Sequence, residues 1–171
     1  PHNDRLEKVD DALDRMETLI DELLSLARSG RQATHVEAVD LATLAANCCR
    51  TVQTPEATVT VRTDQTIRAD RNRLQQLFEN LYRNAVEHNH GDVSITVGPL
   101  SDGFYVADDG RGITDAERED VFEMGYSTAD DGTGFGLNIV RQVADAHEWD
   151  VTLTESRSGG ARIEVTGVES A

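Results

Sequence analysis

The chain has 171 residues, enough for one domain with a sizeable core and one appended helix. Its 32 acidic residues outnumber its 16 basic ones, and a formal net charge of −16 repels nucleic acid and anionic lipid headgroups. We therefore expect no nucleic-acid partner and no direct contact of this chain with a membrane. No apolar run approaches the roughly 18 residues of a membrane span, and no signal peptide opens the sequence. These features predict a cytoplasmic chain, and its start at Pro1 instead of methionine indicates a fragment whose parent protein is free to be membrane-anchored.

The first predicted element is a long amphipathic helix between Asp4 and Arg28. Apolar side chains recur there in steps of three and four over about three heptads: Leu6, Val9, Leu13, Met16, Ile20, Leu23 and Ala27. Such a stripe is typical of a coiled-coil-like seam, so we expect a homodimer through this helix region. Residues 1–30 are therefore the predicted dimerisation unit, and residues 31–39 are a polar linker.

Helices and strands alternate in the predicted remainder, residues 40–171. Asp40 and Asp70 are capping residues that begin two helices, which end near Gln53 and His88. Alternating or β-branched patterns predict strands over residues 58–63, 93–97, 104–107, 151–154 and 161–165. Two more helices are expected over 114–121, which opens with a capping box, and over 137–146. The pattern predicts an α+β fold, a two-layer α/β sandwich in which helices cover one face of a mixed sheet.

The segment DGTGFGLNIV, residues 131–140, places Gly132, Gly134 and Gly136 at alternate positions directly before a helix. Small residues let backbone N–H groups approach an anion, and the helix N-terminus adds about half a positive charge. A phosphate site is the physical expectation, and a merely flexible turn is the alternative. The segment is not a P-loop, because no Lys-Ser or Lys-Thr follows, and no strand precedes it as in a Rossmann fingerprint.

The segment YVADDGRGI, residues 105–113, ends an apolar strand in an acidic pair that is followed by Gly110 and Gly112. Asp108 at the strand terminus can turn its carboxylate into a pocket, while the glycines leave room for a flat ring. The alternative is a tight Asp-Gly turn without a ligand.

Asn80 and Asn84 lie four residues apart on a predicted helix, so their carboxamides share one face beside an apolar stripe. Amides next to a buried stripe need partners, and a hydrated Mg²⁺ that carries phosphate oxygens would supply them. The alternative is that both are ordinary surface or capping amides.

These segments occur in a definite order: an Asn-bearing helix, a strand that ends in Asp-x-Gly-x-Gly, VFEMGYST (residues 121–128), and a glycine loop that opens a helix. In this order the chain resembles, over about residues 40–166, the ATP-binding domain of sensor histidine kinases. That domain belongs to the Bergerat-fold group, which also holds gyrase-type ATPases. The resemblance implies ATP and Mg²⁺ as cofactors and a response regulator receiver domain as a partner. The first helix resembles the second helix of the dimerisation and phosphoacceptor hairpin of these kinases.

The resemblance implies a role for each site residue. Asn84 would coordinate Mg²⁺, Asp108 would accept a hydrogen bond from the adenine amine, and Asn80 and Glu79 are implied for the catalytic step. The other implied nucleotide contacts lie in three segments: Gly110, Gly112 and Ile113; Phe122 and Tyr126; and Gly132, Thr133, Gly134, Phe135, Gly136 and Leu137. The first would shape the adenine pocket, the second would anchor a mobile lid, and the third would wrap the triphosphate.

Two departures from the family pattern change these expectations. Family members often carry Lys and an aromatic residue three and four positions after the Mg²⁺ asparagine, where this chain has Glu87 and His88. A lysine contact to phosphate is therefore lost, and ring stacking falls to the His88 imidazole. The usual His-Gly-Gly turn reads His147-Glu148-Trp149 here, so the bend must be built differently, and Trp149 is predicted to pack and not to bind ligand.

The resemblance implies transfer of the ATP γ-phosphate to a histidine in a His-Glu/Asp-x-Arg/Lys-Asn-Pro-Leu context. No stretch of this sequence has that context, so the acceptor is expected on a missing first helix. A gyrase-like ATPase, the first alternative, needs a Glu one turn before the Mg²⁺ asparagine. Asn80 stands there, and Glu79 lies about 100° around the helix. A nucleotide-regulated binding module is the second alternative.

The composition of the chain, with a single lysine, Lys8, among many acidic residues, also resembles that of proteins from salt-loving archaea.

Overall fold

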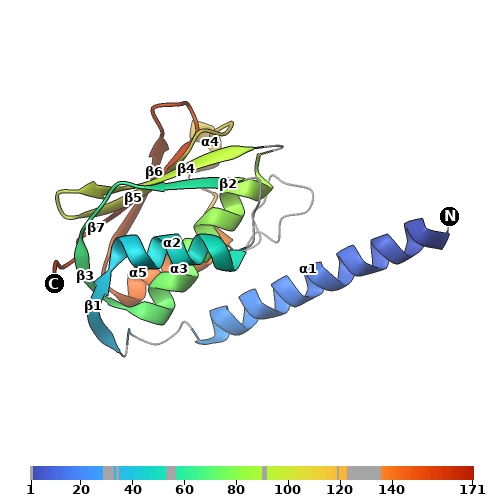
Figure 1. Cartoon of the computed structure of the whole chain (residues 1–171), viewed down its shortest axis with the longest axis horizontal. Helices are drawn as coiled ribbons and strands as arrows, with labels where there is room; N and C mark the ends of the chain where they lie inside the picture. Colours follow the sequence, from blue (N-terminus) through green and yellow to red (C-terminus); the bar gives the residue numbers. More distant parts are fainter. Residues whose placement is uncertain are drawn as a thin grey trace.

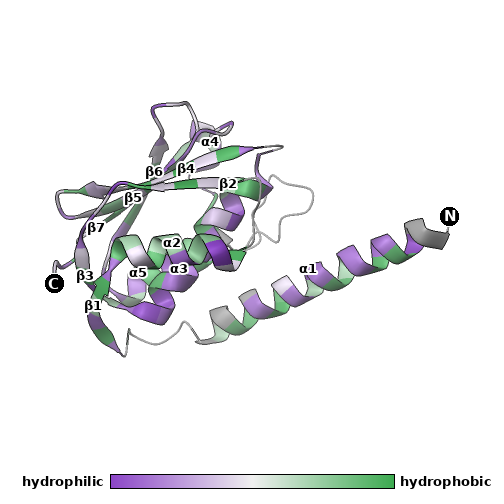
Figure 2. Ribbon diagram, viewed as in Figure 1, coloured by the Kyte–Doolittle hydropathy of each residue, from purple (hydrophilic) through white to green (hydrophobic). Residues whose placement is uncertain are grey.

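The computed structural model describes residues 2–28, 33, 35–52, 57–89, 92–118, 120–122 and 136–171. Helix α1 (His2–Arg28) runs away from the body that the other elements form (Figure 1). Its apolar stripe is exposed, with Leu6 58% and Met16 57% accessible, and it follows one side of the helix (Figure 2). The predicted amphipathic helix is thus confirmed. None of the described helices combines the length and apolarity of a membrane span.

The body is a two-layer sandwich with a mixed sheet. Its elements follow in chain order: β1 (Val36–Asp40), α2 (Leu41–Val52), β2 (Ala57–Val61), β3 (Thr66–Asp70), α3 (Arg71–Glu87), β4 (Val93–Leu100), β5 (Gly103–Asp108), α4 (Asp115–Arg118), α5 (Gly136–Ala146), β6 (Asp150–Glu155) and β7 (Ala161–Thr166). Five strands form the main sheet in the order β2-β4-β5-β7-β6, and only the β2–β4 pair is parallel. Helices α2, α3 and α5 cover one face of this sheet (Figure 1), which confirms the predicted fold class.

Helix α3 is the centre of the helical layer. Its N-cap Asp70 accepts hydrogen bonds from the backbone N–H groups of Asn72 and Arg73 at 3.1 and 3.3 Å, as predicted for a capping residue. Its apolar stripe buries Phe78, whose ring stacks on Phe104 of β5 with centroids 5.5 Å apart. An aromatic pair of this kind adds about 1 kcal/mol beyond the area that it buries. The stripe therefore fixes α3 over the strand that ends in Asp108.

Strands β1 and β3 are additional to the predicted elements. They form an antiparallel two-stranded sheet in which Val36 is opposite Asp70. The C-terminal tail continues this sheet, because Arg68 donates its backbone N–H to Glu169 and Ala171 donates to Thr66, both at 2.9 Å. In β1 only Val39 is buried, so its sequence lacks the alternating pattern that marks a half-buried strand.

The turn after α5 confirms that the bend into β6 is built without glycine. Glu148 takes the left-handed conformation, with φ 61°, that a glycine would adopt at no steric cost. Trp149 is 5% exposed and packs edge-on against Phe104, with centroids 6.5 Å apart, so it is a packing residue as predicted. Of the predicted capping box, the bond from the Thr114 backbone N–H to the Glu117 carboxylate forms, and the helix beside it, α4, is described over Asp115–Arg118.

Candidate functional site

Asp108 is the last residue of β5, and its orientation is set by three hydrogen bonds. Its Oδ1 accepts from the backbone N–H groups of Gly110 at 2.9 Å and of Ala161 at 3.1 Å. Its backbone carbonyl accepts from the hydroxyl of Ser156 at 2.7 Å. Burial raises the pKa of the Asp108 carboxyl, and the two N–H groups oppose that shift. The carboxylate is therefore partly desolvated and held in one orientation.

The turn that follows Asp108 fits closely against its neighbours. Asn89 lies beyond the end of α3, donates to the Ala85 carbonyl at 2.6 Å and accepts from the Arg111 backbone N–H at 2.9 Å. A Cβ on Gly110 would collide with the Asn89 carboxamide. Gly112 has φ 74°, and a Cβ there would lie 2.5 Å from the Gly159 carbonyl oxygen. Glycine is thus required at both positions, because a side chain would collide with the neighbouring atoms.

His88 directly follows α3 and lies beside this turn. Its pKa is lowered, first by burial and then by the positive charge of Arg111, while the charges of Asp108 and Glu117 oppose that shift. The Asp108 carboxylate is thus one of the charges that act on the imidazole. Ile113, which directly follows Gly112, packs against the hydrophobic core.

Asn80 and Asn84 of α3 contain buried polar atoms without partners in the part of the chain that the structure describes. Asn80 is 5% exposed, and its Nδ2 donates to the Gln76 carbonyl at 2.8 Å. Within the described residues, its buried Oδ1 and the buried Nδ2 of Asn84 have no hydrogen-bond partner. An unpartnered buried polar atom costs about 1–3 kcal/mol, so this side of the helix is suited to a polar ligand.

Glu79 does not join the two amides. Its carboxylate accepts from Gln75 Nε2 at 2.7 Å. Burial raises the pKa of the Cys48 thiol on α2 to about 12, and the charge of Glu79 adds to that shift. Glu79 therefore faces α2, whereas Asn80 and Asn84 lie about 100° and 140° further around α3.

Three more of the predicted site residues lie at or beside the start of α5. Gly136 is its first residue, and Leu137 and Phe122 are half-buried against the core. Asn138 donates from Nδ2 to the Phe122 carbonyl at 3.0 Å and accepts from Gln142 at 2.8 Å. The remaining predicted contacts, Tyr126, Gly132, Thr133, Gly134 and Phe135, lie outside the described residues.

Sequence reasoning missed four groups that shape the Asp108 site. They are Asn89, Ser156, Gly160 and the backbone N–H of Ala161. The only signal for any of them was the Ser158-Gly159-Gly160 run, which predicted a hairpin turn and gave no reason to connect that turn with Asp108.

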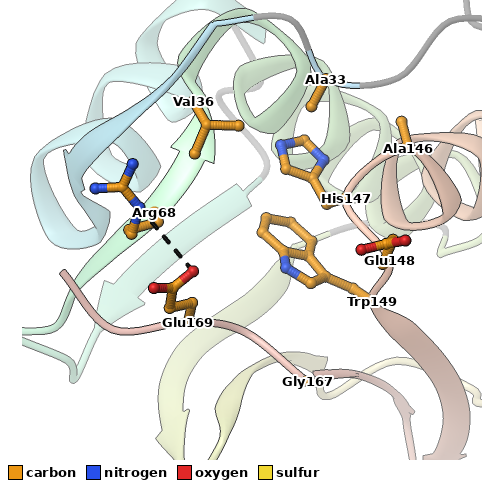
Figure 3. Close-up of a pocket in the computed structure, with 9 residues that line it drawn as sticks. All are labelled: Ala33, Val36, Arg68, Ala146, His147, Glu148, Trp149, Gly167 and Glu169. Atoms are coloured by element: carbon orange, nitrogen blue, oxygen red, sulfur yellow. Dashed lines mark ion pairs between the residues drawn. The ribbon is translucent and has the colours of Figure 1, made fainter.

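A surface pocket of about 410 Å³ lies elsewhere, at the C-terminal end of α5 (Figure 3). Its wall contains His147, whose Nε2 accepts from the Asp70 backbone N–H at 2.9 Å and whose ring stacks on Trp149 with centroids 4.1 Å apart. The linker residue Ala33 also lines it and donates its N–H to the Ala146 carbonyl at 3.2 Å. None of the predicted site residues that the structure describes lines this pocket.

Comparison with known proteins identifies a family over most of the body. The sequence signature of the family described as histidine kinase-, DNA gyrase B-, and HSP90-like ATPase matches residues 69–168. The sensor histidine kinase ZraS of Escherichia coli O157:H7 is 31% identical over 160 residues, which cover 87% of this chain and 34% of the relative. The chain thus spans about a third of the length of these curated relatives.

Solved structures show the same fold. Full-length ShkA in complex with AMPPNP is 28% identical, has a TM-score of 0.73, and is matched over 92% of this chain and 37% of that one. The ATP-binding domain of PrrB from Mycobacterium tuberculosis is 25% identical, has a TM-score of 0.63, and is matched over 81% of this chain and 99% of that domain.

Proposed function

Because the chain belongs to the family of histidine kinase-, DNA gyrase B-, and HSP90-like ATPases, we propose that it is the ATP-binding catalytic region of a sensor histidine kinase. In this proposal the whole protein transfers the γ-phosphate of ATP to a histidine on a dimerisation helix absent from this chain, and a response regulator receives it later. Similarity to ZraS and to the AMPPNP-bound ShkA structure supports both the kinase class and the nucleotide.

The observation that carries the proposal is the fixed orientation of Asp108. The backbone N–H groups of Gly110 and Ala161 both donate to Oδ1. No hydrogen bond in the described part of the chain uses Oδ2. In the proposed complex, Oδ2 accepts a hydrogen bond from the adenine 6-amine. Gly110, Gly112 and Ile113 line the ring, and the His88 imidazole stacks on it. Such a partly desolvated acceptor discriminates strongly, because a base without the amine leaves it unpaired.

Mg²⁺ is proposed at Asn84, with Asn80 near the phosphates. The unpartnered buried atoms of both side chains support this fit. Rotation of the Asn84 carboxamide about its last torsion exchanges Nδ2 for the oxygen that a hard cation prefers. The ion would screen the charge of the phosphate oxygens, while the two amides would hold the phosphates in position.

The segment from Phe122 to Leu137 is proposed as the lid and phosphate loop. Tyr126 would help to anchor the lid. Gly132, Thr133, Gly134, Phe135 and Gly136 would wrap the triphosphate ahead of α5. The position of α5, an 11-residue helix, supports this placement because the N–H groups in the first turn of a helix attract anions. Hydrogen exchange should show stronger protection of the segment in the presence of nucleotide, and equal protection with and without it would contradict the lid.

Phosphoryl transfer is favoured over hydrolysis by the position of Glu79. A gyrase-like ATPase needs a carboxylate beside the amides to activate water. Here Glu79 bonds to Gln75 and faces Cys48 on α2, so Asn80 is the stronger candidate for the transfer step. The remaining alternative, a regulatory binding module, would bind Mg²⁺-ATP without any transfer.

One experiment separates these functions. The chain is mixed with a separate protein that carries a phosphoacceptor helix, together with ATP labelled on its γ-phosphate. We expect label on the helix, and Asp108→Asn should strongly reduce it when ATP is not saturating. Free phosphate without labelled helix would indicate an ATPase, and tight ATP binding without either product would indicate a binding module.

Three further properties belong to the same proposal. The exposed stripe of α1 supports a homodimer, and Leu13→Asp should shift the mass measured by light scattering towards the monomer, whereas Glu17→Gln should not. A cytoplasmic location is proposed for this part of the parent protein.

The net charge of −16 supports the proposal that the protein is halophilic. Raising KCl from about 0.1 M to about 2 M should screen the repulsion between acidic side chains and increase Tm.

A further inference from the structure

The hydroxyl of Ser156 connects two turns that are distant in sequence. It donates to the Asp108 carbonyl at 2.7 Å across 48 positions of the chain. The same oxygen accepts from the Gly160 backbone N–H at 2.9 Å. A side chain at this position must therefore donate and accept at once, which a hydroxyl does and alanine cannot.

The turn from Ser156 to Gly160 is closed around this hydroxyl. Ser156 donates its backbone N–H to the Gly160 carbonyl at 2.8 Å, and Gly159 donates to the Ser156 carbonyl at 3.0 Å. Gly160 is buried, and a Cβ there would lie 2.5 Å from Asp108 Oδ1. The turn is thus pressed directly against the aspartate.

This turn delivers one of the two donors that fix the carboxylate. Ala161 follows Gly160 immediately and donates its backbone N–H to Asp108 Oδ1 at 3.1 Å. If the Gly160 backbone shifts, the Ala161 N–H shifts with it, and Oδ1 keeps only the bond from Gly110. The carboxylate is then free to rotate, and Oδ2 is no longer held towards the ligand.

We propose that Ser156 is a positioning residue for Asp108, and that it sets how strongly the site prefers purine nucleotides that carry an exocyclic 6-amine. The inference rests on the proposed function, because it assigns the amine to Asp108 Oδ2. It adds a residue from the β6–β7 hairpin to a site whose other members lie on α3, β5 and the loops that follow.

The test compares two nucleotides, on the wild type and on four variants, by calorimetry. Mg²⁺-ATP carries the amine, and Mg²⁺-purine riboside triphosphate lacks only that group. The ratio of their affinities reports the bond to Asp108, whereas a general loss of stability lowers both affinities together. Ser156→Ala is expected to reduce this ratio by about 3- to 10-fold, the effect of one misplaced hydrogen bond.

Matched controls come from the same turn. Ser156→Thr keeps a hydroxyl and should restore the ratio to that of the wild type. Ser158→Ala removes an exposed hydroxyl two residues away and should leave the ratio unchanged. Ser156→Cys keeps the size of the side chain with weaker hydrogen bonds, so it should fold even if Ser156→Ala does not, and it should show a smaller loss of the same kind.

The outcomes distinguish this inference from the proposed function. If the wild type binds neither nucleotide, the proposed function fails. If the wild type prefers ATP and both Ser156→Ala and Ser156→Cys prefer it equally, the positioning role is overturned. Should Ser156→Ala lower both affinities by the same factor, the hydroxyl only stabilises the hairpin, and the inference is also overturned.

Discussion

The two sides of the proposed nucleotide site differ in how completely their polar groups are bonded. We call Asn89, Asp108 and Ser156, with the turns that they hold, the adenine wall, and Asn80 with Asn84 on α3 the metal wall. In the adenine wall, Asp108 Oδ1, the Arg111 N–H and the Gly160 N–H are all engaged. In the metal wall, each amide has a buried atom that no described residue satisfies.

The difference indicates that one wall is assembled before the ligand arrives and the other is completed by it. A hydrogen bond that is already made contributes about 1 kcal/mol to the fold, whereas a buried atom without a partner costs about 1–3 kcal/mol. Substitutions that break these bonds in the adenine wall should therefore reduce both stability and affinity. Substitutions in the metal wall should reduce affinity while they leave stability unchanged or improve it.

The largest effect is expected from Asp108→Asn. The amide oxygen keeps the bonds from Gly110 and Ala161, so the free energy of unfolding should stay within about 1 kcal/mol of the wild type. The amide nitrogen then faces the adenine amine, and two donors meet. We expect the Kd for Mg²⁺-ATP, measured by calorimetry, to rise by about 10- to 100-fold. Unchanged affinity would place the base elsewhere.

Asn80→Leu should separate stability from function in the metal wall. Leucine has a similar branched shape, and it removes a buried oxygen that has no partner in the described structure. We expect the free energy of unfolding of the ligand-free chain, measured in urea, to stay equal or rise by about 1 kcal/mol. The affinity for Mg²⁺-ATP should fall by about tenfold. A clear loss of stability would mean that Asn80 is a structural amide, which contradicts the comparison.

The same contrast explains which site residues could be predicted from the sequence. Asn80 and Asn84 were found because a spacing of four places both on one helical face, and Asp108 was found because a strand ends beside glycines. Local periodicity is sufficient for such positions. It also located the helices of the sandwich that the structure describes, although α4, Asp115–Arg118, is shorter than predicted.

The missed residues act over long sequence separations. Asn89 bonds to the Arg111 backbone across 22 positions and Ser156 bonds to Asp108 across 48. These contacts exist only once α3, β5 and the β6–β7 hairpin have packed together, and no local pattern encodes them. Strands β1 and β3 were missed for the same reason, since their pairing joins segments about 30 residues apart and buries little of β1.

Asn89→Ala tests the adenine wall away from the ligand. It removes the acceptor of the Arg111 N–H and leaves space beside Gly110. We expect the free energy of unfolding to fall by about 1 kcal/mol and the Kd for Mg²⁺-ATP to rise by about three- to tenfold, because the turn beside the base becomes less ordered. Asn47→Ala, an exposed asparagine on α2, is the matched control and should change neither. A loss in stability without any loss in affinity would separate this turn from the site.

The smallest expected effect concerns pH. Of the two walls, only the adenine wall carries a group that titrates in this range, the Asp108 carboxyl. Burial raises the pKa of Asp108 above the ordinary 3.8, with Asp109 adding to the shift and His88 opposing it. As the pH falls from 7 towards that raised pKa, protonation begins earlier than for an exposed aspartate, and the acceptor for the adenine amine is lost. The ratio of wild-type to Asp108→Asn affinities for Mg²⁺-ATP cancels the titration of the phosphates. We expect this ratio to shrink as the pH is lowered from 7 to 5. A ratio that stays constant over this range would show that Asp108 remains ionised and that the wall is less desolvated than its burial implies.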